Sequence, residues 1–159
     1  MTDLRVGIGY DAHALEDGVP LVLGGVPVEY PRGLAGHSDG DVISHALIDA
    51  ILGAANLGDI GSLFPSGDEQ YRGASSLDLL WEAYREVREA GWELVNADCV
   101  LVGEEPRIGD VRGEMCERLA GALGVEPSRV TVRATTTDGL GFTGRGEGLA
   151  AQAVALLRR

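Results

Sequence analysis

The three histidines of this chain, His13, His37 and His45, all fall in its first third, and each lies near carboxylates and glycines. Asp11 and His13 are two residues apart, and in an extended segment side chains at i and i+2 point to the same side. With the distant His45 they would give one ion three ligands and leave a fourth position open, as in catalytic zinc sites. Imidazole and carboxylate ligands suit Zn, Mn or Fe better than Ca. The spacing therefore predicts a divalent-metal site at Asp11, His13 and His45, with His37 as a spare imidazole.

An alternative without a metal stays open for the same residues. His13 would then cap a turn, and His45 would be a hydrogen-bonded core histidine. Asp39 and Asp41 lie between His37 and His45. Because carboxylates in the first turn of a helix stabilise its dipole, capping is the ordinary role of this pair. The alternative role is to orient the metal-ligating histidines through hydrogen bonds, without contact with the metal.

Residues 134–148 form a second segment with possible chemistry, because they contain three consecutive threonines and five glycines. Glycines let backbone amides approach a phosphate closely. Threonine hydroxyls could donate to the phosphate, and the forked guanidinium of Arg145 could bind an anion. Asp138 offers a carboxylate for a second metal. The alternative is a glycine-rich connection between two strands, in which the threonines are present for their β-propensity.

Between these two regions, the segment Asp59–Pro65 offers a third candidate. Asp59 could hold substrate hydroxyls, while Phe64 and Pro65 would form one wall of the substrate site. A plain turn capped by Asp59 explains the same residues equally well.

Composition limits the class of partner. The chain has 159 residues and a formal net charge of −12, which argues against nucleic acid and against an anionic membrane. A small phosphorylated substrate stays possible if metal ions supply local positive charge. Lysine is absent, which excludes a Schiff-base mechanism and a Walker loop. Without a signal-like N-terminus or a long apolar run, we expect a cytoplasmic protein. Cys99 and Cys116 are expected to be buried thiols.

Hydrophobic periodicity predicts the elements that must position these residues. We expect Ser38 to be a helix N-cap with Asp41 as a weak capping box, and residues 56–68 to form a loop. The expected fold is a single α/β (α+β) domain over residues 1–159, with a mixed four-stranded sheet, helices on one face and a small hairpin. The expected strands are Leu4–Tyr10, Leu94–Gly103, Arg129–Thr135 and Leu149–Leu157, the hairpin is Leu21–Val28, and the helices run from Ser38 to about Ala55, from Ser75 or Ser76 to about Ala90 and from Asp110 to Leu123.

Four segments together carry a resemblance to a known family. Asp11–His13, His37–His45, Asp59–Pro65 and Ala134–Gly148 resemble, in order and spacing, the 2-C-methyl-D-erythritol 2,4-cyclodiphosphate synthases. The resemblance runs from near residue 5 to the C-terminus. It implies a homotrimer with active sites between subunits, acting in non-mevalonate isoprenoid precursor biosynthesis. The implied reaction converts 4-diphosphocytidyl-2-C-methyl-D-erythritol 2-phosphate into the 2,4-cyclic diphosphate and CMP, by attack of the 2-phosphate on the β-phosphate.

The resemblance also implies roles for individual residues. Asp11, His13 and His45 would ligate Zn²⁺ or Mn²⁺, and a Mg²⁺ or Mn²⁺ near Asp138 would bridge the substrate diphosphate. His37 and Thr136 would stabilise the transition state, and Asp11, His13, His37 and Thr136 would also contact substrate. The other implied substrate contacts are Ser38, Asp59, Ile60, Gly61, Phe64, Pro65, Ser66, Gly67 and Asp68 on the methylerythritol side, and Gly103, Glu104, Glu105, Pro106, Arg107, Ile108, Gly109, Thr135, Thr137, Asp138, Phe142 and Arg145 toward the cytidine diphosphate of a neighbouring subunit.

Two other functions stay open at this stage. One is a metal-dependent phosphohydrolase, in which His37 would be the base that activates a water. The other is a non-catalytic, metal-stabilised trimer that binds nucleotides or isoprenoid phosphates.

Overall fold

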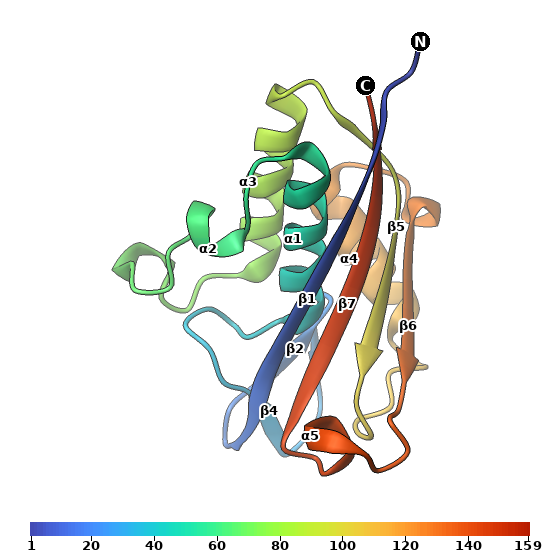
Figure 1. The fold of residues 1–159 in the computed structure, drawn as a ribbon. Helices are drawn as coiled ribbons and strands as arrows, with labels where there is room; N and C mark the ends of the chain where they lie inside the picture. Colours follow the sequence, from blue (N-terminus) through green and yellow to red (C-terminus); the bar gives the residue numbers. More distant parts are fainter.

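The computed structural model describes residues 1–159 and places the helices on one face of a mixed sheet (Figure 1). Neighbouring strands in this sheet are antiparallel except β5 and β6, which are parallel. The sheet has five strands where four were predicted, because a three-residue strand too short to show alternation adds to its edge. The order of the strands is β4 (Arg32–Leu34), β1 (Leu4–Asp17), β7 (Gly148–Arg158), β5 (Glu93–Val102) and β6 (Val130–Thr135).

The predicted hairpin is confirmed as a separate pair of strands, β2 (Leu21–Leu23) and β3 (Val26–Val28), and Gly24 and Gly25 turn between them with positive φ. Helices α1 and α4 lie against the sheet, and α3 packs on both (Figure 1). No helix is long and apolar enough to cross a membrane. The helices are α1 (Val42–Ala55), α2 (Ile60–Leu63), α3 (Ser76–Glu89), α4 (Arg112–Leu123) and α5 (Gly141–Gly144), with 3₁₀ turns at Glu69–Tyr71 and Pro127–Arg129.

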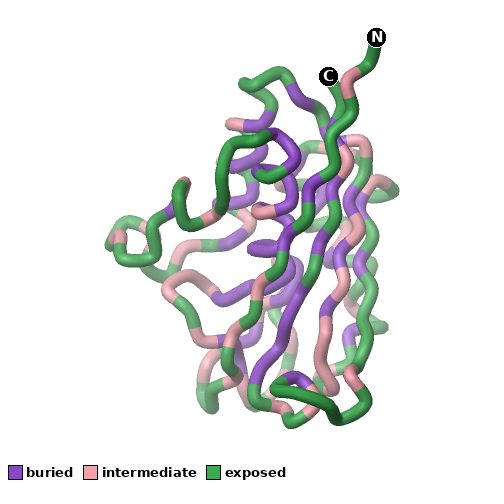
Figure 2. The backbone as a smooth tube through the Cα atoms, viewed as in Figure 1, coloured by how far each residue is buried: buried purple, intermediate pink, exposed green.

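Strand β1 continues well past the predicted end at Tyr10, because it pairs with β7 as far as Ala14 and with β4 beyond. More buried and exposed residues alternate along much of it (Figure 2), as expected for side chains that point in turn to the helix face and to the opposite face. On the helix face, a Cβ added to Gly9 would overlap the carbonyl of Ala46, and one added to Gly7 would overlap the carbonyl of Ala50. The two glycines therefore let α1 touch β1 backbone to backbone.

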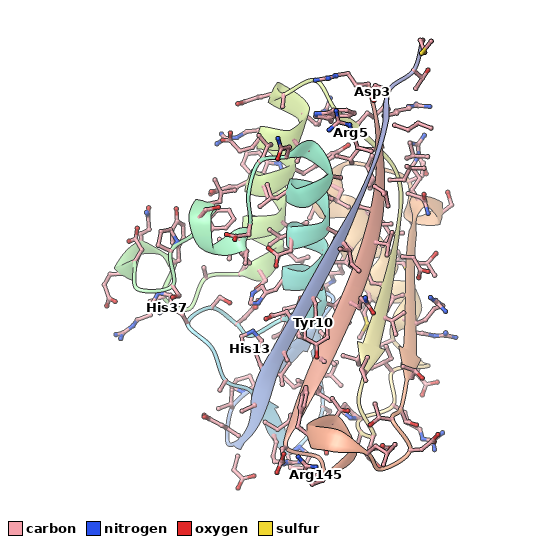
Figure 3. The ribbon with its side chains drawn as sticks, viewed as in Figure 1. Asp3, Arg5, Tyr10, His13, His37 and Arg145 are labelled. Atoms are coloured by element: carbon pink, nitrogen blue, oxygen red, sulfur yellow. The ribbon has the colours of Figure 1, made fainter.

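The opposite face of β1 carries a stripe of apolar side chains in solvent. Leu4, Val6, Ile8 and Tyr10 are 57 to 69% exposed, and Tyr10 stands in front of the sheet in Figure 3. Val154 of β7 is also exposed. Strand β1 therefore packs against α1 with one face and leaves an exposed apolar stripe on the other.

The N-cap of α1 is Asp41, so the prediction that Ser38 caps this helix is wrong. The Asp41 carboxylate is fully buried and accepts from the Ser44 amide (3.2 Å) and hydroxyl (2.6 Å). It also accepts from the amides of Gly24 (2.9 Å) and Gly25 (2.7 Å) in the hairpin turn. One carboxylate therefore joins the β2–β3 turn to the start of α1, and Ser38 is left to face the histidines.

Other details of the core differ little from expectation. The ambiguous C-terminal segment is a strand, as predicted, and β7 lies between β1 and β5. Ala151, Ala153 and Ala155 are among its buried side chains, on the face that α1 covers. Cys99 is buried, as expected, but Cys116 on α4 is only partly buried.

Candidate active site

Three predicted metal ligands come together between β1 and α1. His13 Nε2 lies 2.8 Å from Asp11 Oδ2, His45 Nδ1 lies 2.9 Å from the same oxygen, and the two nitrogens are 3.3 Å apart. A tetrahedral zinc with bonds of 2.0–2.1 Å holds its ligand atoms about 3.3 Å apart. The spacing and the mixed imidazole–carboxylate donors therefore fit a zinc-like cation with one open position.

The local sequence explains this convergence. Asp11 and His13 follow Gly7 and Gly9 on the helix face of β1, so the same alternation that admits α1 also aims both ligands at it. They lie within a continuous strand, not at the strand end that was predicted. His45 comes one helical turn after Asp41 and points back toward β1.

The close contacts within this cluster shift the pKa values of Asp11 and His13. Burial works to raise the pKa of Asp11, but hydrogen bonds and charges from His13 and His45 outweigh it and lower this pKa to about 2. The hydrogen bond with Asp11 raises the pKa of His13 against the opposing effect of burial, and a hydrogen bond with the Ala35 backbone adds to the rise. Asp11 is therefore an anion under all ordinary conditions, as a metal ligand must be.

The other ring nitrogen of His45, Nε2, also has hydrogen-bonding neighbours. It lies 2.8 Å from Ser76 Oγ and 3.1 Å from Ser38 Oγ. Ser76 in turn donates its hydroxyl to Asp39 Oδ1, and its amide donates to Asp39 Oδ2 at 3.0 Å. Of the two roles considered for Asp39 and Asp41, Asp41 caps the helix and Asp39 supports a histidine from behind.

The three ligands open into a pocket of about 190 Å³. His37 also lines it, and its Nε2 donates to the carbonyl of Asp68 at 2.8 Å, so Nδ1 is the nitrogen left to face a ligand. Figure 3 shows His13 and His37 on the same side of β1. The remaining lining residues are Ser38, Ile60, Gly61, Phe64, Ser66, Tyr71 and Leu79.

Sequence reasoning missed two of these residues and included others that do not line the pocket. Tyr71 lies in a 3₁₀ turn without periodicity, and its ring packs edge-on against Phe64 at 5.2 Å between centroids. Leu79 is a buried residue of α3, and no substrate contact was predicted on this helix. The predicted contacts that do not line the pocket are Asp59, Pro65, Gly67 and Asp68.

Residues 56–68 were predicted as a loop, but α2 forms within them. Asp59 is the N-cap of α2 and makes a reciprocal capping box with Ser62, so this helix supports the alternative of an Asp-capped turn. Asp49 of α1 accepts from the Ile60 amide at 2.8 Å and fixes the start of α2. A four-residue helix is too short to show a 3.6-residue period, which is why the sequence did not reveal it.

A second pocket, of about 370 Å³, lies between the loop after β5 and the end of β6. It includes most of the predicted nucleotide-side residues of that loop, together with Thr135 and Thr136. Arg112 and Ala134 also line it and were not predicted, whereas Glu105 does not line it. From the predicted loop, the lining residues are Gly103, Glu104, Pro106, Arg107, Ile108 and Gly109.

The threonine–glycine segment borders this second pocket. Gly139 donates its amide to Glu104 Oε1 at 2.9 Å and so joins the segment to the loop after β5. Thr136 and Asp138 lie 3.3 Å apart through their side-chain oxygens, and Asp138 has a left-handed backbone with φ of 53°. Asp138 is not one of the residues of the metal cluster.

The rest of this segment forms the short helix α5 before β7, so it is not the plain glycine-rich connection that was considered as the alternative. Arg145 lies at this end of the sheet in Figure 3 and pairs with Glu147 at 3.1 Å. Phe142 is exposed, and the Thr137 hydroxyl donates to the carbonyl of Leu140 at 2.6 Å. The two pockets share no lining residue, so one chain does not join the metal cluster to the nucleotide-side loop.

Comparison with known proteins shows the family. Residues 4–158 match the YgbB family. Two proteins described as 2-C-methyl-D-erythritol 2,4-cyclodiphosphate synthase, from Moorella thermoacetica and Rubrobacter xylanophilus, are each 58% identical to this chain. The first match covers 97% of this chain and 94% of the relative, and the second covers 100% and 98%.

Solved structures agree with the sequence matches. A 2C-methyl-D-erythritol-2,4-cyclodiphosphate synthase in its CDP-bound form aligns with a TM-score of 0.88 at 40% identity, over 96% of this chain and 99% of the other. The bifunctional IspDF from Campylobacter jejuni aligns with a TM-score of 0.96 at 43% identity, over 99% of this chain and 43% of that longer one. This chain therefore belongs to the YgbB family, the family of the 2-C-methyl-D-erythritol 2,4-cyclodiphosphate synthases.

Proposed function

We propose that this chain converts 4-diphosphocytidyl-2-C-methyl-D-erythritol 2-phosphate into 2-C-methyl-D-erythritol 2,4-cyclodiphosphate and CMP. The observation that carries the proposal is the meeting of Asp11, His13 and His45 at one pocket wall. It occurs in a chain that matches synthases of this name over nearly its whole length. The reaction is a cyclising phosphorus–oxygen lyase step in non-mevalonate isoprenoid precursor biosynthesis.

The chemistry requires no protein nucleophile, because the 2-phosphate of the substrate attacks its own β-phosphate. Such a transfer depends mainly on positioning and on neutralisation of charge. Zn²⁺ or Mn²⁺ held by Asp11, His13 and His45 would supply Lewis-acid charge stabilisation, with a Mg²⁺ or Mn²⁺ near Asp138 adding to it. These cations would also explain how a chain of net charge −12 could accept a highly anionic substrate.

The protein groups would orient the reacting phosphates. His37 faces the pocket with Nδ1, and the Thr136 hydroxyl lies at the edge of the nucleotide-side pocket. We assign to these two residues the stabilisation of the transition state. Gly61 and Ile60 would hold the methylerythritol moiety with Asp59 behind them, and the two-pocket arrangement would place the cytidine diphosphate against residues 103–109 and 135–138. A relative solved with CDP supports a nucleotide ligand.

A homotrimer with active sites between subunits would complete this arrangement. The metal pocket and the nucleotide-side pocket share no residue within one chain, which supports an arrangement in which a neighbouring copy brings the second pocket to the first. The exposed stripe on β1, Leu4 to Tyr10 at alternate positions, offers an apolar surface for that contact. A single catalytic domain over residues 1–159 and a cytoplasmic location stay predictions.

The test is an assay with the cytidylated substrate and Mg²⁺ in water enriched in ¹⁸O. Cyclisation releases CMP and the cyclic diphosphate, which ³¹P NMR distinguishes from linear phosphates, and neither product gains ¹⁸O. A phosphohydrolase would instead give a linear product carrying one ¹⁸O atom. Binding of CDP without any turnover would point to the non-catalytic alternative, and either of these two results would refute the proposal.

A further inference from the structure

His45 has two ring nitrogens with different neighbours, and a metal ligand must use only one of them. Nδ1 faces Asp11 Oδ2 at 2.9 Å and His13 Nε2 at 3.3 Å, whereas Nε2 faces Ser76 Oγ at 2.8 Å. A neutral imidazole carries a single proton, so the two sides compete for it. If the proton stays on Nδ1 against Asp11, the lone pair needed by a cation is lost.

The direction of the Ser76 hydroxyl decides this competition. Its own proton is donated to Asp39 Oδ1, so the oxygen can only accept from His45. Asp39 Oδ2 also accepts from the Ser76 amide at 3.0 Å, which fixes the serine at the first position of α3. Ser76 is fully buried, so its hydrogen-bonding partners are protein groups.

We infer that Asp39 and Ser76 are a positioning pair that keeps the His45 proton on Nε2 and presents Nδ1 to the metal. The inference rests on the proposed metal site and names two residues that act on it without touching the ion. Ser38 Oγ also lies 3.1 Å from the same nitrogen, but Ser38 lines the pocket, whereas Ser76 is buried behind it. Hydrogen-bond partners of ligating histidines fix the ring tautomer and orientation in many metal sites.

The first measurement is zinc affinity by competition with a chromophoric chelator, for the wild-type chain and Ser76→Ala. We expect Ser76→Ala to bind zinc about 10- to 100-fold more weakly, the usual effect of losing such a partner. Ser75→Ala is the matched control, because Ser75 is the adjacent exposed N-cap of α3 and makes no side-chain capping bond. It should bind zinc as the wild-type chain does.

The second measurement reports on the proton itself. With only three histidines in the chain, long-range ¹H–¹⁵N spectra of the zinc-loaded protein resolve each imidazole. We expect a slowly exchanging Nε2–H on His45 in the wild-type chain and its rapid exchange in Ser76→Ala. Asp39→Asn should weaken zinc binding in the same direction, because either orientation of its side-chain amide turns NH2 toward a backbone N–H, that of Ser76 or that of Asp41.

The outcomes separate the two levels of the proposal. If the wild-type chain binds no zinc, the proposed metal site fails. If the wild-type chain binds zinc and Ser76→Ala binds it within twofold, with an unchanged Nε2–H signal, the positioning pair is refuted while the metal site stands. A loss of thermal stability in Ser76→Ala without any change in zinc affinity would assign Ser76 a purely structural role and refute the inference as well.

Discussion

At the scale of single residues, His45 connects the proposed metal ligands to the buried side chain of Ser76. Its Nδ1 completes the ligand set with Asp11 and His13, and its Nε2 contacts Ser76. The ligand set was predictable from the sequence because i, i+2 spacing on a strand and a histidine one turn into a helix are local patterns. The contact between Asp39 and Ser76 was not predictable, because it joins positions 37 residues apart through tertiary packing.

Replacing His45 with alanine should remove the tightly held metal, because two ligands cannot hold zinc as three do. We expect His45→Ala to contain far less than one zinc per chain by elemental analysis and to lose most activity while its far-UV spectrum is kept. His37→Ala should keep its zinc, since His37 is not one of the clustered ligands. Stoichiometric zinc in His45→Ala would contradict the ligand assignment.

Cys99 gives a prediction about pH. Burial, with a smaller contribution from Asp98, raises the pKa of this thiol from its ordinary 9.0 to about 12. The pKa of Cys99 is higher in the folded chain than in the unfolded chain. The stability that comes from keeping this thiol neutral is therefore complete below about pH 9 and is lost as the pH rises toward 12. Urea unfolding at pH 8 and pH 10.5 should show a loss of about 2 kcal/mol from this group.

Cys99→Ala is the control for this measurement, because it removes the titrating thiol and should reduce the pH-dependent loss by that amount. Iodoacetamide at pH 8 should modify the partly buried Cys116 and leave Cys99 unmodified in the folded chain. Rapid alkylation of Cys99 would show that the thiol is not enclosed as described.

At the scale of elements, the contact of β1 with α1 holds the site together. Gly9→Ala would place a methyl group on the Ala46 carbonyl, next to His45, and must push the helix from the strand. We expect the free energy of unfolding to fall by about 1–3 kcal/mol and zinc binding to weaken. Gly53→Ala on α1 is the control, because its Cβ would meet nothing closer than 4.0 Å; it should keep zinc affinity and gain about 0.5–1 kcal/mol.

The position of α2 depends on Asp49. Removing its carboxylate in Asp49→Ala leaves the Ile60 amide without its partner, and we expect KM to rise about two- to tenfold while zinc content is unchanged. Asp49→Asn keeps an acceptor oxygen, so its KM should stay near the wild-type value. Equal KM values in the two variants would show that this hydrogen bond does not position α2.

The elements that the sequence did not reveal share a physical cause. The four-residue helices α2 and α5 and the three-residue strand β4 are each too short to repeat the hydrophobic pattern by which helices and strands are recognised. Longer elements with clear alternation or a helical stripe, such as β5, β7 and α3, were predicted within a few residues of their observed ends. The N-cap of α1 was misplaced because the tertiary contact of Asp41 with the hairpin turn outweighs the local capping-box pattern.

At the scale of the whole molecule, the apolar stripe on β1 predicts self-association. Ile8→Glu would place a charge in that stripe, and we expect light scattering to show a shift from the proposed trimer to a monomer, with loss of activity because the proposed site between subunits could not form. Trp81→Glu on α3 is the control, since Trp81 is similarly exposed but lies outside the stripe. An unchanged mass for Ile8→Glu would exclude β1 as the contact surface.

The alternation along β1 also bears on how the chain reaches its native state. Gly7, Gly9, Asp11 and His13 share one face, so a shift of one residue in strand pairing would turn all four away from α1 and press bulky side chains onto the helix. A misaligned chain would then be unable to capture the ion. Stopped-flow refolding with a fluorescent zinc indicator would therefore count correctly aligned molecules as they appear.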